Sequence, residues 1–407
     1  MTVMVPIHSV SPSGSTAPLW LTPRSLYAHV PFCAARCGYC DFAIAVGREE
    51  AIDTYLGALE AELARVVPGS PLPMDTWFVG GGTPSVLSAG QLTRLGRILA
   101  RAGPLTAGAE ASLEANPESF DAGKAHALAS VGFTRVSLGV QSFAGPTLQA
   151  LERPHDAALV ESAVAAARMA GLEVSLDLIF GAPGQTLELW REDLRRAVDL
   201  GPEHLSVYGL TYERGTPLEK KARARLVLPL AEEVERDLYD LAMTHLEESG
   251  YRQYEISNFS RPGHASRHNR AYWANHAHLG LGMGAAGYRD GSRTLNTRDL
   301  DRYLRQALAG ENTAFQTESL TPCETAHETL MLNLRRLEGV VAEEFHGRTG
   351  FTLASVLGDA AAPLVEQGLL QADAQGLRLT RAGRFVADAV IVKLLAGAPD
   401  HPAEPAL

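Results

Sequence analysis

The chain has 407 residues and 46% of them are hydrophobic, so it is long enough for more than one domain and apolar enough to build a sizeable core. Its 36 Lys and Arg against 47 Asp and Glu give a net charge of −11, which argues against broad binding to nucleic acid. No apolar run reaches the length of a membrane span and no signal peptide precedes the first strand, so we expect a cytoplasmic protein with at most peripheral membrane contact.

Short apolar strands alternate with longer helical patterns after a tail-like segment over residues 1–22. The expected strands of this core, residues 23–250, are Ser25–Val30, Thr76–Val79, Ala109–Glu114, Arg135–Val140, Glu173–Ile179 and His204–Gly209. The expected helices are Ala51–Val66, Leu87–Arg101, Asp156–Ala170, Leu187–Leu200 and Ala231–Glu248. Six β–α units predict a parallel sheet, either open or curled into a barrel. In a barrel, the polar residues that follow these strands should then lie together at the end of the barrel where the strands have their carboxyl ends.

The pattern changes in the second half of the chain. Residues 251–315 read as a β-rich extension that completes the site, with strand-like pieces at Tyr251–Phe259, Gly280–Tyr288 and Arg293–Thr297. Residues 316–395 predict a compact, mainly helical domain with a two-stranded wing, similar to a winged-helix module. Because this domain lacks a dense basic helix, we expect packing or partner docking rather than nucleic-acid binding. Residues 396–407 again resemble a tail.

The most specific motif is a group of three cysteines, Cys33, Cys37 and Cys40, directly after the first expected strand. Their spacing, C-x3-C-x2-C, brings three thiolates from one loop to a single point and supplies no fourth. A [4Fe–4S] cube has four irons that each need a ligand, so three thiolates leave one iron open to a small molecule. Tyr39 is placed to flank that molecule, although simple packing within the loop explains it equally well.

Two other uses of these cysteines remain open from the spacing. A structural zinc site needs four closed ligands, and the only other cysteine, Cys323, lies far away in an expected helix where it would pack. Disulfides fit poorly, because sparse cysteines without a secretory signal are typical of a reducing compartment. The number and spacing of the ligands favour the iron–sulfur cluster.

A glycine-rich segment, Gly80-Gly-Gly-Thr-Pro-Ser85, follows the second expected strand. Successive glycines let the backbone approach a ligand closely, and free N–H groups could meet a carboxylate or a phosphate. The segment is neither a dinucleotide-binding fingerprint nor a P-loop. A tight turn between strand and helix accounts for it as well.

Polar side chains also end or interrupt three later strands. Glu114 ends the third strand, Gln141 ends the fourth, and Asp177 lies within the apolar fifth. A carboxylate in such a strand needs a partner if it is buried. Arg153 could supply that partner in a structural ion pair, or could bind the carboxylate of a ligand with its two-pronged guanidinium.

A cluster of rings occurs in Ser266-Arg-His-Asn-Arg-Ala-Tyr-Trp273. The imidazole of His268, a phenol and an indole this close together could hold a flat conjugated ligand. A histidine can also be an axial ligand of haem iron. The plainer interpretation is a polar histidine in a surface loop.

With these motifs the chain resembles the radical S-adenosylmethionine superfamily, and within it the coproporphyrinogen III oxidase-like branch, from about residue 26 to residue 395. The motifs that carry the resemblance are Pro31-Phe-Cys33, Arg36-Cys-Gly-Tyr-Cys-Asp-Phe42, Gly80-Gly-Gly-Thr-Pro-Ser85, Glu114-Ala-Asn-Pro-Glu118, Gly139-Val-Gln-Ser-Phe143, Asp177-Leu-Ile-Phe-Gly181, Tyr254-Glu-Ile-Ser-Asn-Phe259 and His268-Asn-Arg-Ala-Tyr-Trp273. It implies an α/β fold in which a partial (β/α)6 barrel is joined to the C-terminal, winged-helix-like domain.

The resemblance also implies a cofactor and the residues that hold it. The open iron of the cluster would be chelated by the amino and carboxylate groups of S-adenosylmethionine. The methionine end would be held by the backbone at Gly81 and Gly82 together with Thr83. The remaining cofactor contacts that it implies are Tyr27, Tyr39, Glu114, Gln141, Arg153 and Asp177. In active members a low-potential donor such as flavodoxin or ferredoxin provides the electron that cleaves the cofactor to a 5′-deoxyadenosyl radical.

Phe42 bears on which function within the branch is expected. Oxygen-independent coproporphyrinogen III oxidases carry a fourth cysteine two residues after the third, where this chain has Phe42. The Cys-Asp-Phe ending instead resembles the haem chaperones of the HemW type, which bind haem and pass it to apoproteins. His268 and Tyr272 match the H-N-x-x-Y signature of that group. We therefore expect a haem chaperone, with His268 first and Tyr272 second as axial ligand, and oxidative decarboxylation of coproporphyrinogen III as the alternative.

Two positions depart from the pattern of these chaperones. Arg270 and Ala286 stand where relatives often have histidine. The departures leave the cluster motif intact, but they argue against a histidine-rich haem pocket.

Overall fold

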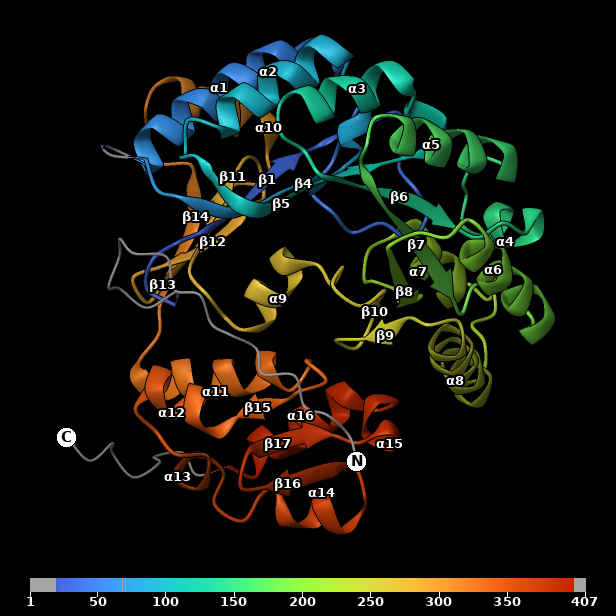
Figure 1. Cartoon of the computed structure of the whole chain (residues 1–407), viewed down its shortest axis with the longest axis vertical. Helices are drawn as coiled ribbons and strands as arrows, with labels where there is room; N and C mark the ends of the chain where they lie inside the picture. Colours follow the sequence, from blue (N-terminus) through green and yellow to red (C-terminus); the bar gives the residue numbers. More distant parts are fainter. Residues whose placement is uncertain (1–19, 68, 70, 399–407) are drawn as a thin grey trace.

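The computed structural model describes residues 20–67, 69 and 71–398, so the expected tails lie for the most part outside the described residues. A large α/β domain packs above a smaller C-terminal domain, and a short helix, α9 (Arg267–Trp273), lies between them (Figure 1). Among the described helices, none is both long enough and apolar enough to cross a bilayer.

Six parallel strands form the centre of the large domain. In spatial order they are β1 (Ser25–Val30), β4 (Met74–Gly81), β5 (Leu105–Ala115), β6 (Arg135–Gln141), β7 (Glu173–Phe180) and β8 (His204–Gly209). Every neighbouring pair is parallel. The expected partial (β/α)6 barrel is therefore confirmed, with β1 and β8 at their predicted bounds.

Helices cover the outer face of these strands (Figure 1). They are α1 (Ile52–Val66), α2 (Ala89–Leu99), α3 (Ala122–Ser130), α5 (Ala157–Met169), α6 (Leu187–Asp199) and α8 (Glu232–Glu248). Side chains set where several of them begin: Ser88 forms a capping box with Gln91 at α2, and Asp156 caps α5. Because these helix starts are fixed, the loops that precede them are also held in place, and these loops carry candidate site residues.

Strands from the second half of the chain extend the sheet at both edges. β11 (His278–Leu281) pairs parallel with β1, followed by antiparallel β12 (Ala286–Arg289), β13 (Ser292–Asn296) and β14 (Ala314–Ser319). β10 (Asn258–Ser260) and β9 (Arg252–Gln253) lie beyond β8. The remaining strands and α-helices described in this domain are β2 (Phe32–Cys33), β3 (Ala45–Val46), α4 (Gly145–Ala150), α7 (Pro217–Arg223) and α10 (Leu300–Leu308).

The C-terminal domain has its own apolar core, separate from that of the large domain. Its helices are α11 (Pro322–Asn333), α12 (Ala342–Thr349), α13 (Leu353–Leu357), α14 (Ala362–Glu366), α15 (Arg381–Arg384) and α16 (Ala387–Ala396). The expected wing is β16 (Leu370–Asp373) with β17 (Gly376–Leu379), and a third strand that the sequence did not indicate, β15 (Val340–Val341), pairs with β17.

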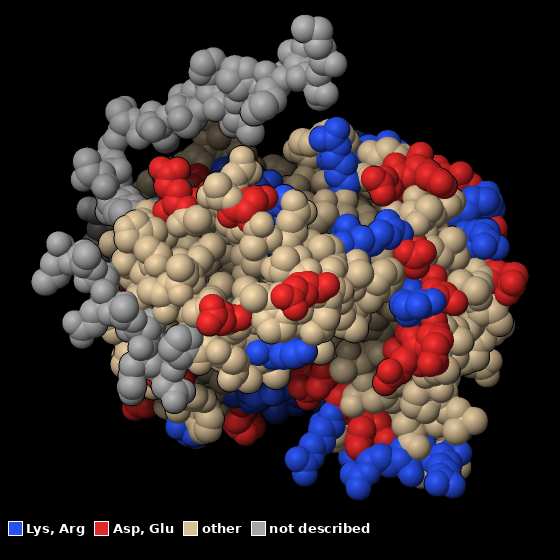
Figure 2. All heavy atoms as spheres, turned by 90° about the horizontal axis from the view of Figure 1, so that it is seen from below, with Lys and Arg blue, Asp and Glu red and all other residues tan. Residues whose placement is uncertain are grey.

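Charges on the underside of the molecule are mixed. Figure 2 shows this face with Lys and Arg interspersed among Asp and Glu, around a largely uncharged middle. Over the described residues of this face no continuous basic stripe is seen, and a packing or docking role for the C-terminal domain stays a prediction.

Candidate functional site

The three cysteines lie on the loop that begins at the end of β2. Cys33 ends β2 and is buried, and the N–H of Cys40 donates to the carbonyl of Cys37 at 3.2 Å. The spacing of the cysteines predicts three thiolates at a single point, but in the described part of the chain no three His, Cys, Asp or Glu side chains are arranged to hold one metal ion. A [4Fe–4S] cube does not require the three sulfurs to meet at one ion, because each thiolate binds a different iron.

Two side chains donate hydrogen bonds to these sulfurs. The hydroxyl of Thr83 lies 3.4 Å from Cys33 Sγ, and Nη1 of Arg153 lies 3.4 Å from Cys37 Sγ. Burial raises the pKa of the Cys33 thiol to about 11. Without a ligand Cys33 is therefore a thiol at neutral pH, and the positive charge of a bound iron would favour the thiolate. The donor set fits a [4Fe–4S] cluster, because hydrogen bonds to ligating sulfur stabilise its negative charge.

The glycine segment supports the cysteine loop through the N–H groups of Gly81, Gly82 and Thr83, which are bonded within the protein. The N–H of Gly81 donates to a Glu114 carboxylate oxygen at 3.1 Å, that of Gly82 to the Val30 carbonyl at 2.8 Å, and that of Thr83 to the Phe32 carbonyl at 2.8 Å. At these three positions the expectation of free N–H groups is therefore wrong. A role for Gly81, Gly82 and Thr83 at the methionine end stays a prediction that would use their other groups.

Close packing explains why a glycine is required at position 82. A Cβ on Gly82 would lie 2.6 Å from the carbonyl oxygen of Pro31, immediately before β2. Real Cβ atoms do not come that close to backbone oxygen, so a larger residue would push the cysteine loop outward.

Arg153 lies beside the cysteine loop and not beside Asp177. Its Nη2 donates to Asn116 Oδ1 at 2.7 Å and to the Gly139 carbonyl at 3.0 Å. Asp177 accepts instead from the hydroxyl of Ser137, at 3.0 and 3.1 Å. The structural Asp–Arg pair that the sequence left open is therefore not formed, and Asn116 joins the group through a contact that strand periodicity does not reveal.

Gln141 ends β6 in an unusual backbone conformation, with φ at 63° and a register shift from Gly139 to Gln141 against β7. Its Nε2 lies 2.9 Å from the point where a Cβ on Gly139 would stand. The bulge and the missing side chain together turn Gln141 toward the Arg153 side of the strand end.

Glu114 and Asp177 form the electrostatic centre of the barrel interior. Burial, and for Glu114 the neighbouring Asp177 carboxylate, raise the pKa of Glu114 to about 7 and that of Asp177 to about 6. Two carboxyls that are costly to ionise side by side favour a cationic ligand. The ammonium and sulfonium groups of S-adenosylmethionine meet this requirement.

A cavity of about 740 Å³ is lined by residues of both predicted sites, although none of the three cysteines lines it. It extends from Phe42 on the cysteine loop, past Glu114 and Asp177, to His268 and Tyr272 on α9, and the C-terminal domain contributes Met331 and Leu332 to its wall. Tyr27 also lines it, whereas Tyr39, Gln141 and Arg153 do not. Tyr39 packs against a small apolar cluster of Leu151, Ile179 and Ala182. The cavity volume is in the range typical of small-molecule and cofactor sites.

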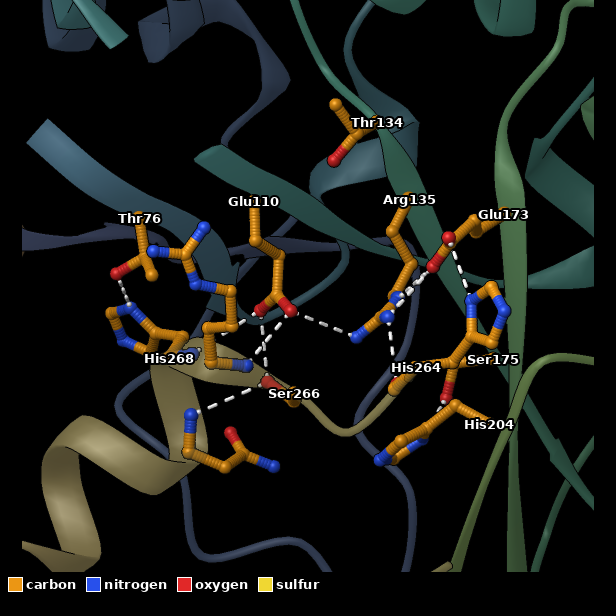
Figure 3. A network of polar contacts seen from close by, with 12 residues as sticks. Thr76, Glu110, Thr134, Arg135, Glu173, Ser175, His204, His264, Ser266 and His268 are labelled. Carbon is orange, nitrogen blue, oxygen red and sulfur yellow. Dashed lines mark hydrogen bonds and ion pairs between the residues drawn. The ribbon is translucent and has the colours of Figure 1, made fainter. Parts of the chain in front are cut away.

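A buried carboxylate fixes the start of α9 (Figure 3). Glu110 of β5 accepts from the Ser266 hydroxyl at 2.9 Å, from the Arg267 N–H at 2.8 Å and from the His268 N–H at 3.3 Å. It is also paired with Arg135 of β6 at 3.0 Å. The pair lies within the sheet and satisfies the free N–H groups of the first turn of α9, so it determines where His268 stands. Sequence reasoning missed Glu110 and Arg135, because their role depends on strand register.

His268 is a buried residue and not the surface-loop histidine that the plainer interpretation expected. Its Nδ1 is 2.8 Å from the Thr76 hydroxyl, its ring stacks on Phe78 at 5.1 Å, and Tyr272 lies 5.0 Å away. Its Nε2 is buried without a hydrogen-bond partner among the described residues. Burial lowers the pKa of His268 to about 3, so the imidazole is neutral and one of its two ring nitrogens is unprotonated.

Comparison with known proteins gives matches over nearly the whole chain. The model of the radical SAM superfamily matches residues 27–197, and that of the HemN C-terminal domain matches residues 320–386. The heme chaperone HemW of Bacillus subtilis is 36% identical over 375 residues, which cover 90% of this chain and 98% of that protein. The heme chaperone HemW of Lactococcus lactis is 34% identical, covering 92% of this chain and 97% of its own length.

A solved structure is similar to most of the fold. The coproporphyrinogen III oxidase HemN from Escherichia coli, described as a radical SAM enzyme, superposes with a TM-score of 0.81 at 25% identity. The match covers 91% of this chain and 90% of that one.

Proposed function

The chain belongs to the HemW-type branch of the radical S-adenosylmethionine superfamily, and from this membership we propose that it is a haem chaperone. Membership of the superfamily implies a [4Fe–4S] cluster and S-adenosylmethionine. Haem would be the cargo, and apoproteins that need haem would be the partners. Phe42 favours the chaperone over the oxidase, because it stands where the oxidases of the branch have a fourth cysteine. Its side chain lines the cavity and is 64% exposed.

Cys33, Cys37 and Cys40 would hold the cluster, with Thr83 and Arg153 donating to two of the sulfurs. Glu114 and Asp177 would face the cationic groups of the cofactor. When bound, the reduced cluster can supply one electron to S-adenosylmethionine. The further contacts proposed for S-adenosylmethionine are Gly81, Gly82, Thr83, Gln141, Tyr27 and Tyr39. The proposed electron donor is a low-potential flavodoxin or ferredoxin.

Haem would occupy the part of the cavity next to α9. His268 is the first proposed axial ligand, since it is neutral and its Nε2 has no partner among the described residues, and Tyr272 is the second. The aromatic rings of Phe78 and Tyr272 provide flat apolar surface for a porphyrin.

The alternative is coproporphyrinogen III oxidation, which the similarity to the HemN structure supports. One experiment separates the two functions. The reduced, cluster-loaded protein is incubated with S-adenosylmethionine and coproporphyrinogen III, and the products are analysed by mass spectrometry. A parallel sample is titrated with haem. We expect a haem Soret band without protoporphyrinogen formation, and robust turnover would overturn the proposal.

A further inference from the structure

We propose that His278 is a second ligand for haem iron in this cavity, in addition to His268. The inference rests on the proposed function. It concerns a residue of β11 that neither the family signature nor the sequence analysis marks.

Hydrogen bonding divides the four histidines that line the cavity into two pairs. Both ring nitrogens of His29 are used, by the Tyr27 hydroxyl at 2.9 Å and the Ala43 carbonyl at 2.7 Å. Both nitrogens of His204 are also used, by the hydroxyls of Ser175 at 2.8 Å and Tyr254 at 2.9 Å. Neither of these imidazoles has a nitrogen left for a metal.

The other pair is His268 and His278. Of these two, only His278 has a hydrogen-bond partner that determines which ring nitrogen carries the proton. Its Nδ1 lies 3.1 Å from the carbonyl oxygen of His276. A carbonyl can only accept, so Nδ1 must carry the proton and the neutral ring keeps a lone pair on Nε2. Among the described residues, Nε2 of His278 has no hydrogen-bond partner. Metal-ligating histidines commonly donate their second ring N–H to a backbone carbonyl in this way.

The two candidates differ in how easily iron can reach them. Nε2 of His268 is enclosed, since it is buried against its surroundings without contact to solvent, and its ring is fixed by Thr76 and Phe78. His278 lines the same cavity but is not fixed on that side. Nε2 of His278, unlike that of His268, is not among the fully buried, unpartnered atoms of the described residues, so haem iron could reach it from the cavity.

The neighbours of His278 suit a porphyrin better than a bare metal ion. Tyr272 stacks on its ring at 4.3 Å with 29° between the planes, which provides a flat aromatic contact. Across the adjacent strands His278 is paired with Tyr288, and Tyr288 with Arg293, so the three side chains point to one face of the sheet. Arg293 also lines the cavity, where its guanidinium is paired with Glu328 at 2.5 Å, so a carboxylate of haem would share this cation with Glu328.

His278 also bears on the departures seen in the sequence. Arg270 and Ala286 remove histidines that relatives often have, which argued against a histidine-rich pocket. Ala286 begins β12, the strand that pairs with β11. The cavity nevertheless contains a second available imidazole, on β11 in place of β12.

The test is an anaerobic titration of the cluster-loaded full-length protein with ferric haem, followed by absorption and electron paramagnetic resonance spectra. His278→Phe keeps a ring against Tyr272 but removes the lone pair. His278→Met supplies a thioether, which is another haem ligand. His276→Ala is the matched control, because it removes a neighbouring imidazole and keeps the carbonyl that orients His278.

We expect His278→Phe to weaken haem binding by at least about tenfold, the lower range for disturbed metal sites. His268→Ala alone should keep a histidine-type spectrum, the double variant His268→Ala with His278→Phe should lose it, and free imidazole should restore it. His278→Met should shift the spectrum, and His276→Ala should match the parent.

Two experimental outcomes would overturn two different claims. Haem affinity and spectra unchanged by His278→Phe, in both the parent and the His268→Ala background, would overturn the role of His278 and leave the haem chaperone standing. Absence of haem binding by the parent protein would overturn the proposed function itself. The cluster absorption of each variant reports whether it is folded.

Discussion

Exchange of Glu114 for Gln should make the protein more stable at alkaline pH while weakening its binding of S-adenosylmethionine. Burial and the Asp177 carboxylate raise the pKa of Glu114 from its ordinary value of 4.5 to about 7. At about 1.4 kcal/mol per pH unit, ionising this carboxyl inside the fold costs about 3 kcal/mol. That figure is an upper limit, because the cavity admits water, which screens the charge.

The sign follows from proton linkage. The folded protein holds the Glu114 proton more tightly than the unfolded chain, so the free energy of unfolding falls as the pH rises from about 4.5 to about 7. Glu114→Gln removes this loss, and its amide oxygen can still accept from the Gly81 N–H. The variant should gain up to about 3 kcal/mol at pH 8 and little at pH 5.

Glu110→Gln is the matched control on the same strand. Glu110 is buried, whereas Glu114 is half-buried, and Glu110 is paired with Arg135 and accepts three hydrogen bonds from the start of α9. Removing one charge of a buried pair typically costs about 3–5 kcal/mol, so this variant should be less stable at pH 8.

Urea denaturation of both variants and the parent at pH 5 and pH 8, with equal cluster loading, measures the two effects. Equilibrium dialysis measures S-adenosylmethionine binding. A Glu114→Gln variant that is less stable than the parent at pH 8 would refute the electrostatic reasoning.

Three further outcomes are expected. Cys37→Ala should abolish the roughly four irons per chain that anaerobic reconstitution gives; an unchanged iron content would remove the cluster assignment. His268→Ala should weaken haem binding in a Soret titration and leave the cluster spectrum alone, and an unaltered titration would exclude His268 as a ligand. Gly82→Ala should lower cluster occupancy by iron analysis, because its Cβ would meet the Pro31 carbonyl at 2.6 Å, whereas Gly90→Ala in α2, with open space around it, should not; equal occupancy in the two would contradict the packing argument.

Local patterns in the sequence were sufficient for the parallel core. Alternating apolar strands and amphipathic helices predicted β1 and β8 at their observed bounds, because both signals lie within a few residues. β5 begins at Leu105, earlier than the predicted Ala109, since its first half is partly exposed and lacks a continuous apolar run. α9 was not predicted, because it is only seven residues long and its start is satisfied by Glu110 from a distant strand.

Parts of the candidate site depend on tertiary contacts that no local motif reveals. The Asp177–Arg153 pair was a reasonable suggestion from two charges, but the register places Ser137 beside Asp177 and turns Arg153 to Asn116 and the cysteine loop. His278 shows the same limit, because its availability as a ligand follows from one backbone hydrogen bond to His276.

The central claim is that this chain carries haem and does not make its porphyrin precursor. The most direct measurement is transfer of haem from the loaded, purified protein to an apoprotein acceptor, followed by the change in the Soret spectrum after the two are separated. Our account predicts that haem binds to the chain and then appears on the acceptor. Failure to bind or release haem, together with conversion of coproporphyrinogen III, would contradict it.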